Sequence, residues 1–488
     1  MRTFLLFPFL LGAACAELSL QEIEALYADG GGGGGSGGGW QTSPNPRPTG
    51  GGGGTQTAST CPAIDGTDNA GTRHNARTIS GHETWTSRGS PHFVTGAIEI
   101  DEGGTLVIEP CAQVVLDTRA YLRAGGTSAG TLRARGTAGR PIVIQPFDND
   151  YHGGVYVGSA GKADLAFLLI YRGGIPGDLN YRAALSIKGD DNQEAPLQQV
   201  RVDNLVLMDS PALGLELTAA GGFTDDSREL SIFRSGHQST EERFRYAALV
   251  EPLSLSTLPT GRYEGSAINA IFANSRGAVL GDLHLKNLGI PYDFPEYLSM
   301  YVPSTSAAGD VITLTIDPGV VVQLGKGWKL SSGLALSDPR RRQTGVQVVA
   351  NGTAEAPILF TSRKADPKPG DWVSIDWDAS PGTGNSLRHV IFEYGGARDS
   401  GANGYGCGPT KSDALLVIRQ WVPEPGMVVD SVFRHSASSA LVSGWASPQQ
   451  LPDLSLENTF ENIANACQVS RPSSGSYCAS DTSPDCFL

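Results

Sequence analysis

The sequence is poor in charged residues, above all basic ones, and it has no long apolar run after its first sixteen residues. Charged residues make up 18% of the 488 residues, and 36 basic residues stand against 50 acidic ones, which gives a formal net charge of −14. Phosphate binding requires a concentrated basic surface, so we expect no nucleic-acid partner. No later stretch approaches the roughly 18 apolar residues of a membrane helix, so we expect no membrane-spanning helix there.

Glycine, in contrast, is abundant, with 63 residues. The runs "GGGGGGSGGG" (Gly30–Gly39) and "GGGGG" (Gly50–Gly54) enclose a proline-rich segment, which is the composition of a flexible tether. We therefore interpret residues 17–60 as a short helix, Glu17–Asp29, followed by a Gly/Pro-rich linker.

Residues 1–16, "MRTFLLFPFLLGAACA", have the layout of a secretory signal: one positive charge, an apolar stretch and then small residues. Two endings remain open. Ala14-Cys15-Ala16 fits simple cleavage, whereas "LGAAC" resembles the lipobox of bacterial lipoproteins, which implies lipidation of Cys15. The tether favours lipidation, because a tether is most useful when one end is fixed. The expected location is the outer membrane or cell surface, with only the lipid in the membrane, or the exterior if Cys15 is removed.

The cysteine count also indicates export. Of the seven cysteines, six remain after Cys15 is set aside, and an even number suits disulfides in an exported protein. The disulfide candidates are Cys61, Cys111, Cys407, Cys467, Cys478 and Cys486. The last three lie in residues 467–488, which we interpret as a Cys-rich cap or tail.

One phrase of the chain occurs twice. "TLVIEPCAQVVL" (Thr105–Leu116) returns as "TLTIDPGVVVQL" (Thr313–Leu324), and two downstream blocks repeat in the same order. These blocks are Ala134–Ile144 with Ala350–Phe360, and Leu165–Gly174 with Leu387–Gly396. Insertions between them change the spacing but not the order. We therefore interpret residues 61–470 as one domain with two long internal repeats, 78–225 and 295–445.

The repeated blocks are short Val-, Ile-, Leu- and Thr-rich stretches separated by turn residues, which predicts strands and no long helices. A single coil of such strands cannot bury its inner face, but stacked coils bury a continuous core and pair the strands in parallel. Gly319 follows proline at a corner that favours positive φ. Cys111 occupies the same place, so it bends that corner differently or accepts strain. We expect a disulfide from Cys111 to Cys61.

Several motifs resemble the right-handed parallel β-helix of pectin-lyase-like bacterial surface proteins, among them "GGTLVIEPC", "GTAGRPIVI", "NGTAEAPILFTS", "GDWVSIDW" and "VIFEYGGA". The resemblance implies an all-β solenoid after the signal peptide and tether. It implies no single function, because this architecture hosts polysaccharide lyases, hydrolases, adhesins and proteins without activity. Glycoside hydrolases of this shape carry an ordered series of motifs, and here the series is broken.

The stretch "DWVSIDWD" is the best candidate site. If strand alternation places Val373, Ile375 and Trp377 inward, the opposite side chains point outward. These outward residues are Trp372, Ser374, Asp376 and Asp378. An aromatic platform beside two carboxylates suits a sugar or Ca²⁺, and Asp376 and Asp378 are the candidate catalytic residues if the chain is an enzyme. The alternative interpretation is an ordinary solvated strand face.

Asp148 and Asp150 in "DNDYH" are further Ca²⁺ candidates, although a turn stabilised by hydrogen bonds from side chain to backbone is the favoured interpretation. We expect no other cofactor. The leading functional hypothesis is a non-enzymatic surface or outer-membrane protein that binds a polysaccharide or an envelope protein. The alternatives are a polysaccharide lyase or glycoside hydrolase acting on an acidic polysaccharide, and a structural spacer in the envelope.

Overall fold

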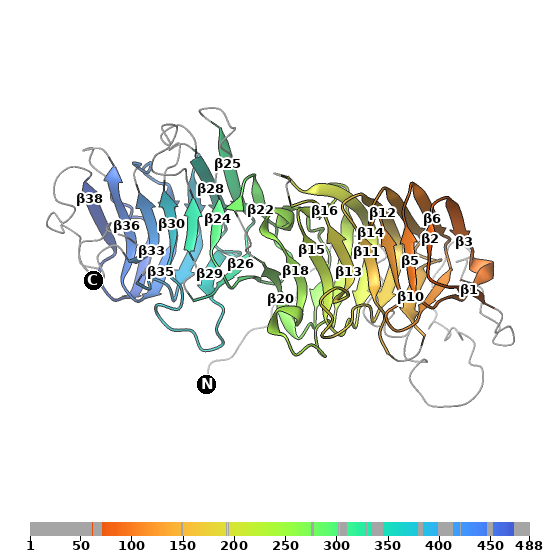
Figure 1. Ribbon diagram of the computed structural model, residues 1–488. Helices are drawn as coiled ribbons and strands as arrows, with labels where there is room; N and C mark the ends of the chain where they lie inside the picture. Colours follow the sequence, from red (N-terminus) through yellow and green to blue (C-terminus); the bar gives the residue numbers. More distant parts are fainter. Residues whose placement is uncertain are drawn as a thin grey trace, which may run out of the picture.

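The computed structural model describes residues 61, 71–147, 150–191, 193, 195–274, 278–300, 302, 310–326, 329–332, 345–378, 384–398, 413–419, 421–446 and 452–472. Within them, the strands stack side by side along an elongated body (Figure 1). Every ladder between named strands whose register is defined is parallel, for example β6 (Gly104–Ile108) with β9 (Gly130–Arg135). The predicted all-β solenoid is therefore confirmed as a parallel β-helix.

A twelve-stranded sheet covers two faces of the N-terminal half, residues 71–274. Besides β6 and β9 it contains β1 (Thr72–His74), β3 (His82–Trp85), β4 (His92–Val94), β7 (Gln113–Leu116), β10 (Ile142–Pro146), β12 (Gly161–Tyr171), β14 (Leu197–Met208), β16 (Gly221–Phe223), β17 (Arg228–Phe233) and β19 (Tyr263–Glu264). β12 and β14 bend between the two faces, at Phe167 and Asn204, where φ is positive.

A fourteen-stranded sheet runs through both halves. From the N-terminal half come β2 (Arg77–Ile79), β5 (Ala97–Ile100), β8 (Tyr121–Ala124), β11 (Gly154–Val157), β13 (Ala183–Lys188), β15 (Leu213–Thr218), β18 (Tyr246–Val250) and β20 (Ile268–Ala273). From the C-terminal half, residues 278–472, come β23 (Tyr292–Phe294), β26 (Val321–Leu324), β29 (Ile358–Ser362), β32 (Val390–Glu393), β35 (Val432–Ser436) and β37 (Thr459–Ile463).

Two further sheets belong to the C-terminal half. The seven-stranded sheet contains β21 (Ala278–Val279), β24 (Leu298–Met300), β27 (Lys329–Ser332), β30 (Ser374–Asp378), β33 (Ala414–Arg419), β36 (Ser439–Ala446) and β38 (Gln468–Pro472). The five-stranded sheet contains β22 (Leu283–Leu285), β25 (Val311–Ile316), β28 (Gly345–Asn351), β31 (Ser386–Arg388) and β34 (Val428–Val429). In the described residues, the helical elements are the short 3-10 helices η2 (Ser87–Gly89), η3 (Glu242–Phe244) and η4 (Pro252–Thr257), and the predicted helix Glu17–Asp29 lies outside these residues. No described helix is long and apolar enough to cross a membrane.

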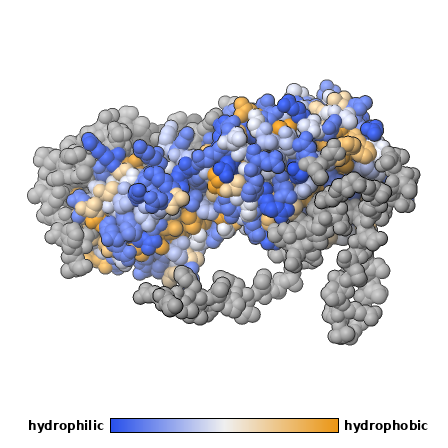
Figure 2. Space-filling view, turned by 90° about the horizontal axis from the view of Figure 1, so that it is seen from below, coloured by the Kyte–Doolittle hydropathy of each residue, from blue (hydrophilic) through white to orange (hydrophobic). Residues whose placement is uncertain are grey.

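The inward side chains form one continuous apolar core from Ile79 to Ile463. Strand alternation builds it: Ile108, Ala134 and Leu165 occupy successive register positions, and all three are buried. In the C-terminal half, the rings of Phe360, Phe392, Phe433 and Phe460 stack one on the next, with centroids 5.3, 4.9 and 5.4 Å apart. On the face shown in Figure 2, hydrophilic residues predominate and hydrophobic ones form smaller patches between them.

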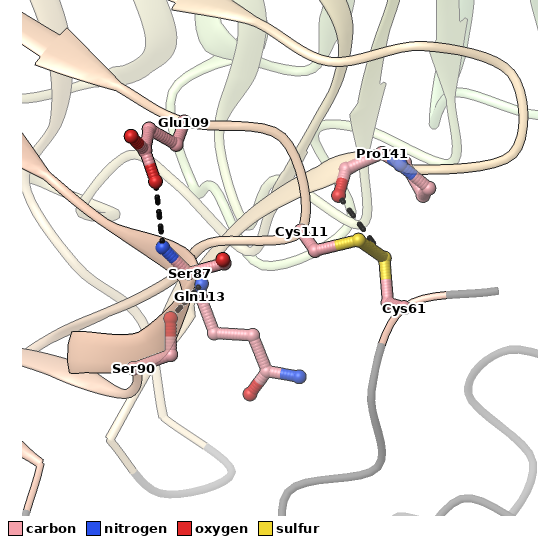
Figure 3. Close-up of a disulfide and its surroundings, with 7 residues drawn as sticks. All are labelled: Cys61, Ser87, Ser90, Glu109, Cys111, Gln113 and Pro141. Atoms are coloured by element: carbon pink, nitrogen blue, oxygen red, sulfur yellow. Dashed lines mark hydrogen bonds between the residues drawn. A yellow bond between two sulfur atoms is a disulfide. The ribbon is translucent and has the colours of Figure 1, made fainter. Parts of the chain in front are cut away.

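The corner between β6 and β7 confirms the predicted disulfide. Cys61 is bonded to Cys111, and the Cys61 sulfur lies 3.9 Å from the carbonyl oxygen of Pro141 (Figure 3). Cys111 has φ 69°, close to the 78° of Gly319 at the equivalent corner between β25 and β26. Cys111 therefore keeps the corner that glycine makes and accepts the strain of the left-handed region, while the disulfide attaches Cys61 to the coil.

The sequence repeat shows that the fourteen-stranded sheet joins two non-equivalent faces. In the first copy of the repeat, β6 and β7 both belong to the twelve-stranded sheet, whereas their counterparts β25 and β26 belong to the five-stranded and fourteen-stranded sheets. In the same way, β10 and β12 correspond to β29 and β32. The counterparts of β8 and β11 are therefore β27 and β30, which lie in the seven-stranded sheet.

Candidate functional site

The predicted site on β30 does not have the expected geometry. Ile375 and Trp377 point into the core as predicted. The prediction that Trp372 points outward as an aromatic platform is wrong. Its side chain is completely buried in the core, and its Nε1 donates a hydrogen bond of 2.9 Å to the Glu393 carbonyl oxygen. Trp372 lies before the first residue of β30, next to the turn at Asp371, so strand alternation does not apply to it.

Ser374 and Asp376 are not exposed on a solvated surface either, because both are buried. Asp376 pairs in register with Val417, which belongs to an apolar cluster on the outer side of the seven-stranded sheet. This face is therefore covered, and a sugar chain has no access to these two side chains. The side chain of Asp378 lies outside the described part of the structure.

The calcium candidates find little support from geometry. Asp148 lies outside the described residues, and Asp150 is exposed and accepts a hydrogen bond of 3.3 Å from the Thr118 hydroxyl. The described residues contain no group of three or more His, Cys, Asp or Glu side chains placed to hold a metal ion. Cys467 is disulfide-bonded. Cys15, Cys407, Cys478 and Cys486 lie outside the described residues.

A different cluster lies on the outer side of the fourteen-stranded sheet, in the N-terminal half. We call it the tyrosine face. Its members come from β5, β8, β11, β15 and the loop before β13, and they are Glu99, Tyr121, Arg123, Tyr156, Tyr181, Arg182 and Glu216.

Strand alternation sets the direction of these side chains. Ile98 and Ile100 are fully buried in the core, so Glu99 between them points outward. Glu99 pairs in register with Arg123 of β8, and Arg123 pairs with Tyr156 of β11. Outward residues of neighbouring strands therefore lie side by side in one row across the sheet.

The loop between β12 and β13 brings Tyr181 to this row. The carboxylate of Asp178 accepts hydrogen bonds from the backbone N–H groups of Asn180 and Tyr181, at 2.9 and 3.3 Å. The Ile175 N–H donates to the Tyr181 carbonyl oxygen and closes the loop. This turn holds the Tyr181 side chain in a fixed position beside β8 and β11.

The three tyrosine rings contact one another. Tyr121 and Tyr181 are stacked, with ring centroids 4.8 Å apart. Tyr156 meets both rings edge-on, at 5.8 Å from Tyr121 and 5.5 Å from Tyr181. All three side chains are partly exposed. The arrangement offers a rigid, partly apolar surface whose hydroxyl groups are in place for hydrogen bonds.

Each carboxylate of the tyrosine face is paired with an arginine. Glu99 accepts hydrogen bonds from Arg123 Nε at 2.5 Å and from the Tyr121 hydroxyl at 2.7 Å. Glu216 is buried and accepts a hydrogen bond of 2.8 Å from Arg182 Nε. Burial and the hydrogen bond with Glu99 are among the causes that raise the pKa of Tyr121, so its hydroxyl stays protonated at neutral pH.

The Tyr156 hydroxyl differs from its neighbours. Its oxygen is buried, and it has no hydrogen-bond partner among the described residues. Burial, and after it the charge of Glu216, raise the pKa of Tyr156 well above its ordinary value. A buried hydroxyl without a partner costs free energy, so a ligand or water that supplied an acceptor or donor here would be stabilised.

The sequence analysis missed this cluster. The segment "GGVYVG" has no acidic residue that would indicate a site, although Tyr156 is its outward residue. The available signal was the outward position of Tyr121 and Tyr156 in neighbouring coils. The approach of Tyr181 depends on the loop and has no sequence pattern of its own.

Comparison of the chain with protein-family models, with curated proteins and with solved structures finds no match. The functional argument therefore depends on the geometry of the chain itself.

Proposed function

We propose that the chain is an exported, pectin-lyase-like β-helix of the bacterial surface that binds a polysaccharide without cleaving it. The observation that supports this proposal is the tyrosine face. Stacked and edge-on tyrosine rings present flat C–H and π surfaces against which a sugar ring packs. The ordered hydroxyl, carboxylate and guanidinium groups around them match the hydroxyl groups of a sugar.

Because its charged groups are already paired, we expect the tyrosine face to recognise the shape of a ligand more than the charge of a ligand. Arg123 with Glu99 and Arg182 with Glu216 each combine opposite charges, so neither pair attracts an ion strongly over a distance. The Tyr156 hydroxyl adds an unused hydrogen-bonding group at the centre of the rings. A neutral or weakly charged polysaccharide segment is the ligand class that these groups suit best.

The two carboxylates of the face do not form a catalytic pair. From Glu99 the register passes through Arg123, Tyr156 and Ser186 to Glu216, which is four strand spacings. At about 4.8 Å per strand the separation is roughly 19 Å. Glycosidase carboxyl pairs stand only about 5–9.5 Å apart, so acid–base hydrolysis at this face is not expected.

Tyr121→Ala tests the proposal. The variant should bind the polysaccharide selected on a glycan array about tenfold more weakly, because it removes one ring of the stack and the hydroxyl bonded to Glu99. Tyr394→Ala is the matched control, since Tyr394 also stacks on a neighbouring ring, His435, but lies in the C-terminal half.

Equal affinity of Tyr121→Ala and the unaltered protein would contradict the proposed site. Incubation with acidic polysaccharides and Ca²⁺, followed by ultraviolet absorbance, examines the enzyme alternative. The appearance of unsaturated products would show a lyase and overturn the binding-only function.

The anchoring part of the proposal depends on Cys15. We expect the unaltered protein in the outer-membrane fraction and Cys15→Ser outside it, because the lipid is the proposed attachment. An unchanged membrane fraction for Cys15→Ser would refute lipidation while leaving the tyrosine face untouched.

A further inference from the structure

The β-helix changes its construction between the two halves. We call the stretch from the end of β19 at Glu264 to the start of β22 at Leu283 the junction. Of the four described sheets, the twelve-stranded one ends before it, and the seven- and five-stranded ones begin in it or after it. The fourteen-stranded sheet alone has described strands on both sides. Among the described residues, the strand ladders of two faces are therefore interrupted at the same level of the rod.

The sheet that crosses the junction is narrow there. The ladder between β20 and β23 registers two residue pairs, Ile271 with Tyr292 and Phe272 with Asp293. On another face, η4 takes the place of a strand between β16 and β22, and its Ser256 hydroxyl accepts a hydrogen bond of 2.8 Å from the His284 N–H. Few backbone bonds therefore resist bending at this level.

A cluster of charged and hydroxyl groups bridges the junction on the outer side of the same sheet. Arg363 follows β29 in the C-terminal half, and its Nε lies 3.0 Å from Asp293 Oδ1. Its Nη2 donates to Glu242 at 2.6 Å and to the Tyr246 hydroxyl oxygen at 2.9 Å, and both of these residues belong to the N-terminal half. The Tyr246 hydroxyl in turn donates to Asp293. The Arg363 guanidinium therefore contacts two residues of the N-terminal half, Glu242 and Tyr246, that lie more than a hundred positions earlier in the sequence.

The cluster is strong because it is partly removed from water. Asp293 is only 3% exposed, and a buried carboxylate is stable only when it is paired and hydrogen-bonded. Asp293 receives Arg363 and Tyr246 together in the observed alignment of the two halves. Bending at the junction would separate Tyr246 from Asp293 and Glu242 from Arg363, whereas the ion pair of Arg363 and Asp293 lies within the C-terminal half and would persist. The buried Asp293 would then lose one of its two hydrogen-bond partners.

The opposite side of the junction has weaker attachments. There the Lys286 ammonium donates to the Leu258 carbonyl oxygen at 3.0 Å, in addition to the bond between His284 and Ser256. Burial lowers the pKa of Lys286, which means that this site favours the ammonium less than water does. The resistance to bending is therefore unequal on the two sides.

We propose that the junction is a hinge between the two halves and that the cluster of Arg363, Asp293, Tyr246 and Glu242 is the latch that holds it straight. The latch lies on the same sheet as the tyrosine face, so the angle of the hinge sets whether one long ligand can follow both halves of the rod. The latch itself does not depend on the proposed binding function.

Arg363→Ala tests the latch in the full-length protein. We expect the Ile271 amide, which donates to the Pro291 carbonyl across the junction, to exchange its hydrogen about tenfold faster. We also expect small-angle X-ray scattering to report a wider distribution of shapes. Arg201→Ala is the matched control, because Arg201 also bonds two carboxylates, Asp164 and Asp226, but within the N-terminal half.

Two milder variants keep the test decisive if Arg363→Ala does not fold. Glu242→Gln removes a single charge at an exposed position, and Arg363→Lys keeps the charge but loses the planar fork of donors. Both should change the exchange of Ile271 in the same direction and by less. The latch would be overturned if Arg363→Ala folds and shows unchanged hydrogen exchange at Ile271 and unchanged scattering. If Arg363→Ala does not fold, the same result for Glu242→Gln would overturn it.

Discussion

The face that carries the tyrosine face in the N-terminal half has an equivalent in the C-terminal half, and the two surfaces differ in chemistry. Successive outward positions are Tyr156, Ser186 and Glu216 in the N-terminal half, and the equivalent positions are Asp376, Val417 and Val442. The first set is polar, with Tyr156 partly exposed and Ser186 and Glu216 buried, whereas all three residues of the second set are buried and two of them are apolar. The inward residues form the core that maintains the β-helix, so the outward residues can differ in chemistry between the two halves without changing the fold.

The comparison extends to histidine. His74, His92 and His152 lie in the N-terminal half, and burial lowers the pKa of each of them, to about 4 for His74 and His152. His74 and His92 close the first coil beside the Trp85 ring, which stacks on both. At the other end of the rod, the last described ring of the core is Phe460, which cannot titrate. The two halves should therefore respond differently to acid.

The hydrogen bonds explain why these histidines stay neutral. His74 receives a bond from Arg77 and contacts His92 at 3.0 Å, and His92 in turn donates to the Thr86 carbonyl oxygen. Each of these two histidine rings uses one nitrogen as a hydrogen-bond acceptor, so protonation of that nitrogen breaks the hydrogen bond. The Glu83 carboxylate favours the proton, but burial, His92 and Arg77 outweigh it. His152 likewise accepts from the Gly154 N–H.

The largest expected effect is acid destabilisation of the N-terminal half alone. Because the folded-state pKa is lower than the unfolded value of 6.5, the unfolded chain binds more protons below pH 6.5, and stability is lost as the pH falls toward 4. Between pH 6.5 and about pH 4.5, His74 and His152 together should remove about 4 kcal/mol. This window lies above the ordinary range of carboxylates.

Hydrogen exchange read separately for β8 and β33, with rates corrected for pH, measures this difference. Protection should fall in β8 and persist in β33. His435→Gln, a substitution at a partly exposed ring of the C-terminal half, should leave the profile unchanged, and His152→Gln should reduce the acid response. Equal loss of protection in both halves would contradict the assignment of the effect to these histidines.

The sequence predicted the parts of this molecule that depend on local pattern. The doubled phrase predicted parallel coils, and the Cys111 and Gly319 corners took nearly the same φ, with the expected disulfide to Cys61. Alternation also placed Ile375 and Trp377 in the core. These features follow from spacing within one coil, where neighbouring residues determine the outcome.

Features that depend on contacts between distant segments could not be predicted in the same way. Alternation gives the direction of Asp376 but not whether the outer face is covered, and Trp372 fell beyond the strand to which alternation applies. The contact of Tyr181 with Tyr121 depends on a loop conformation. The joining of non-equivalent faces in the fourteen-stranded sheet depends on how β20 meets β23, and no single coil encodes that pairing.

A reciprocal exchange of equivalent outward residues gives the next largest effect. Val442→Glu places a carboxylate in a fully buried position of an apolar cluster and should lower the free energy of unfolding by about 3 kcal/mol. Glu216→Val should cost less, about 1–2 kcal/mol, because Arg182 is partly exposed and can turn toward water. Urea unfolding of both variants, with Val442→Ile as a size control, measures the difference. Equal costs for the two exchanges would show that the equivalent faces tolerate the same chemistry, and the contrast between the halves would then lie only in their loops.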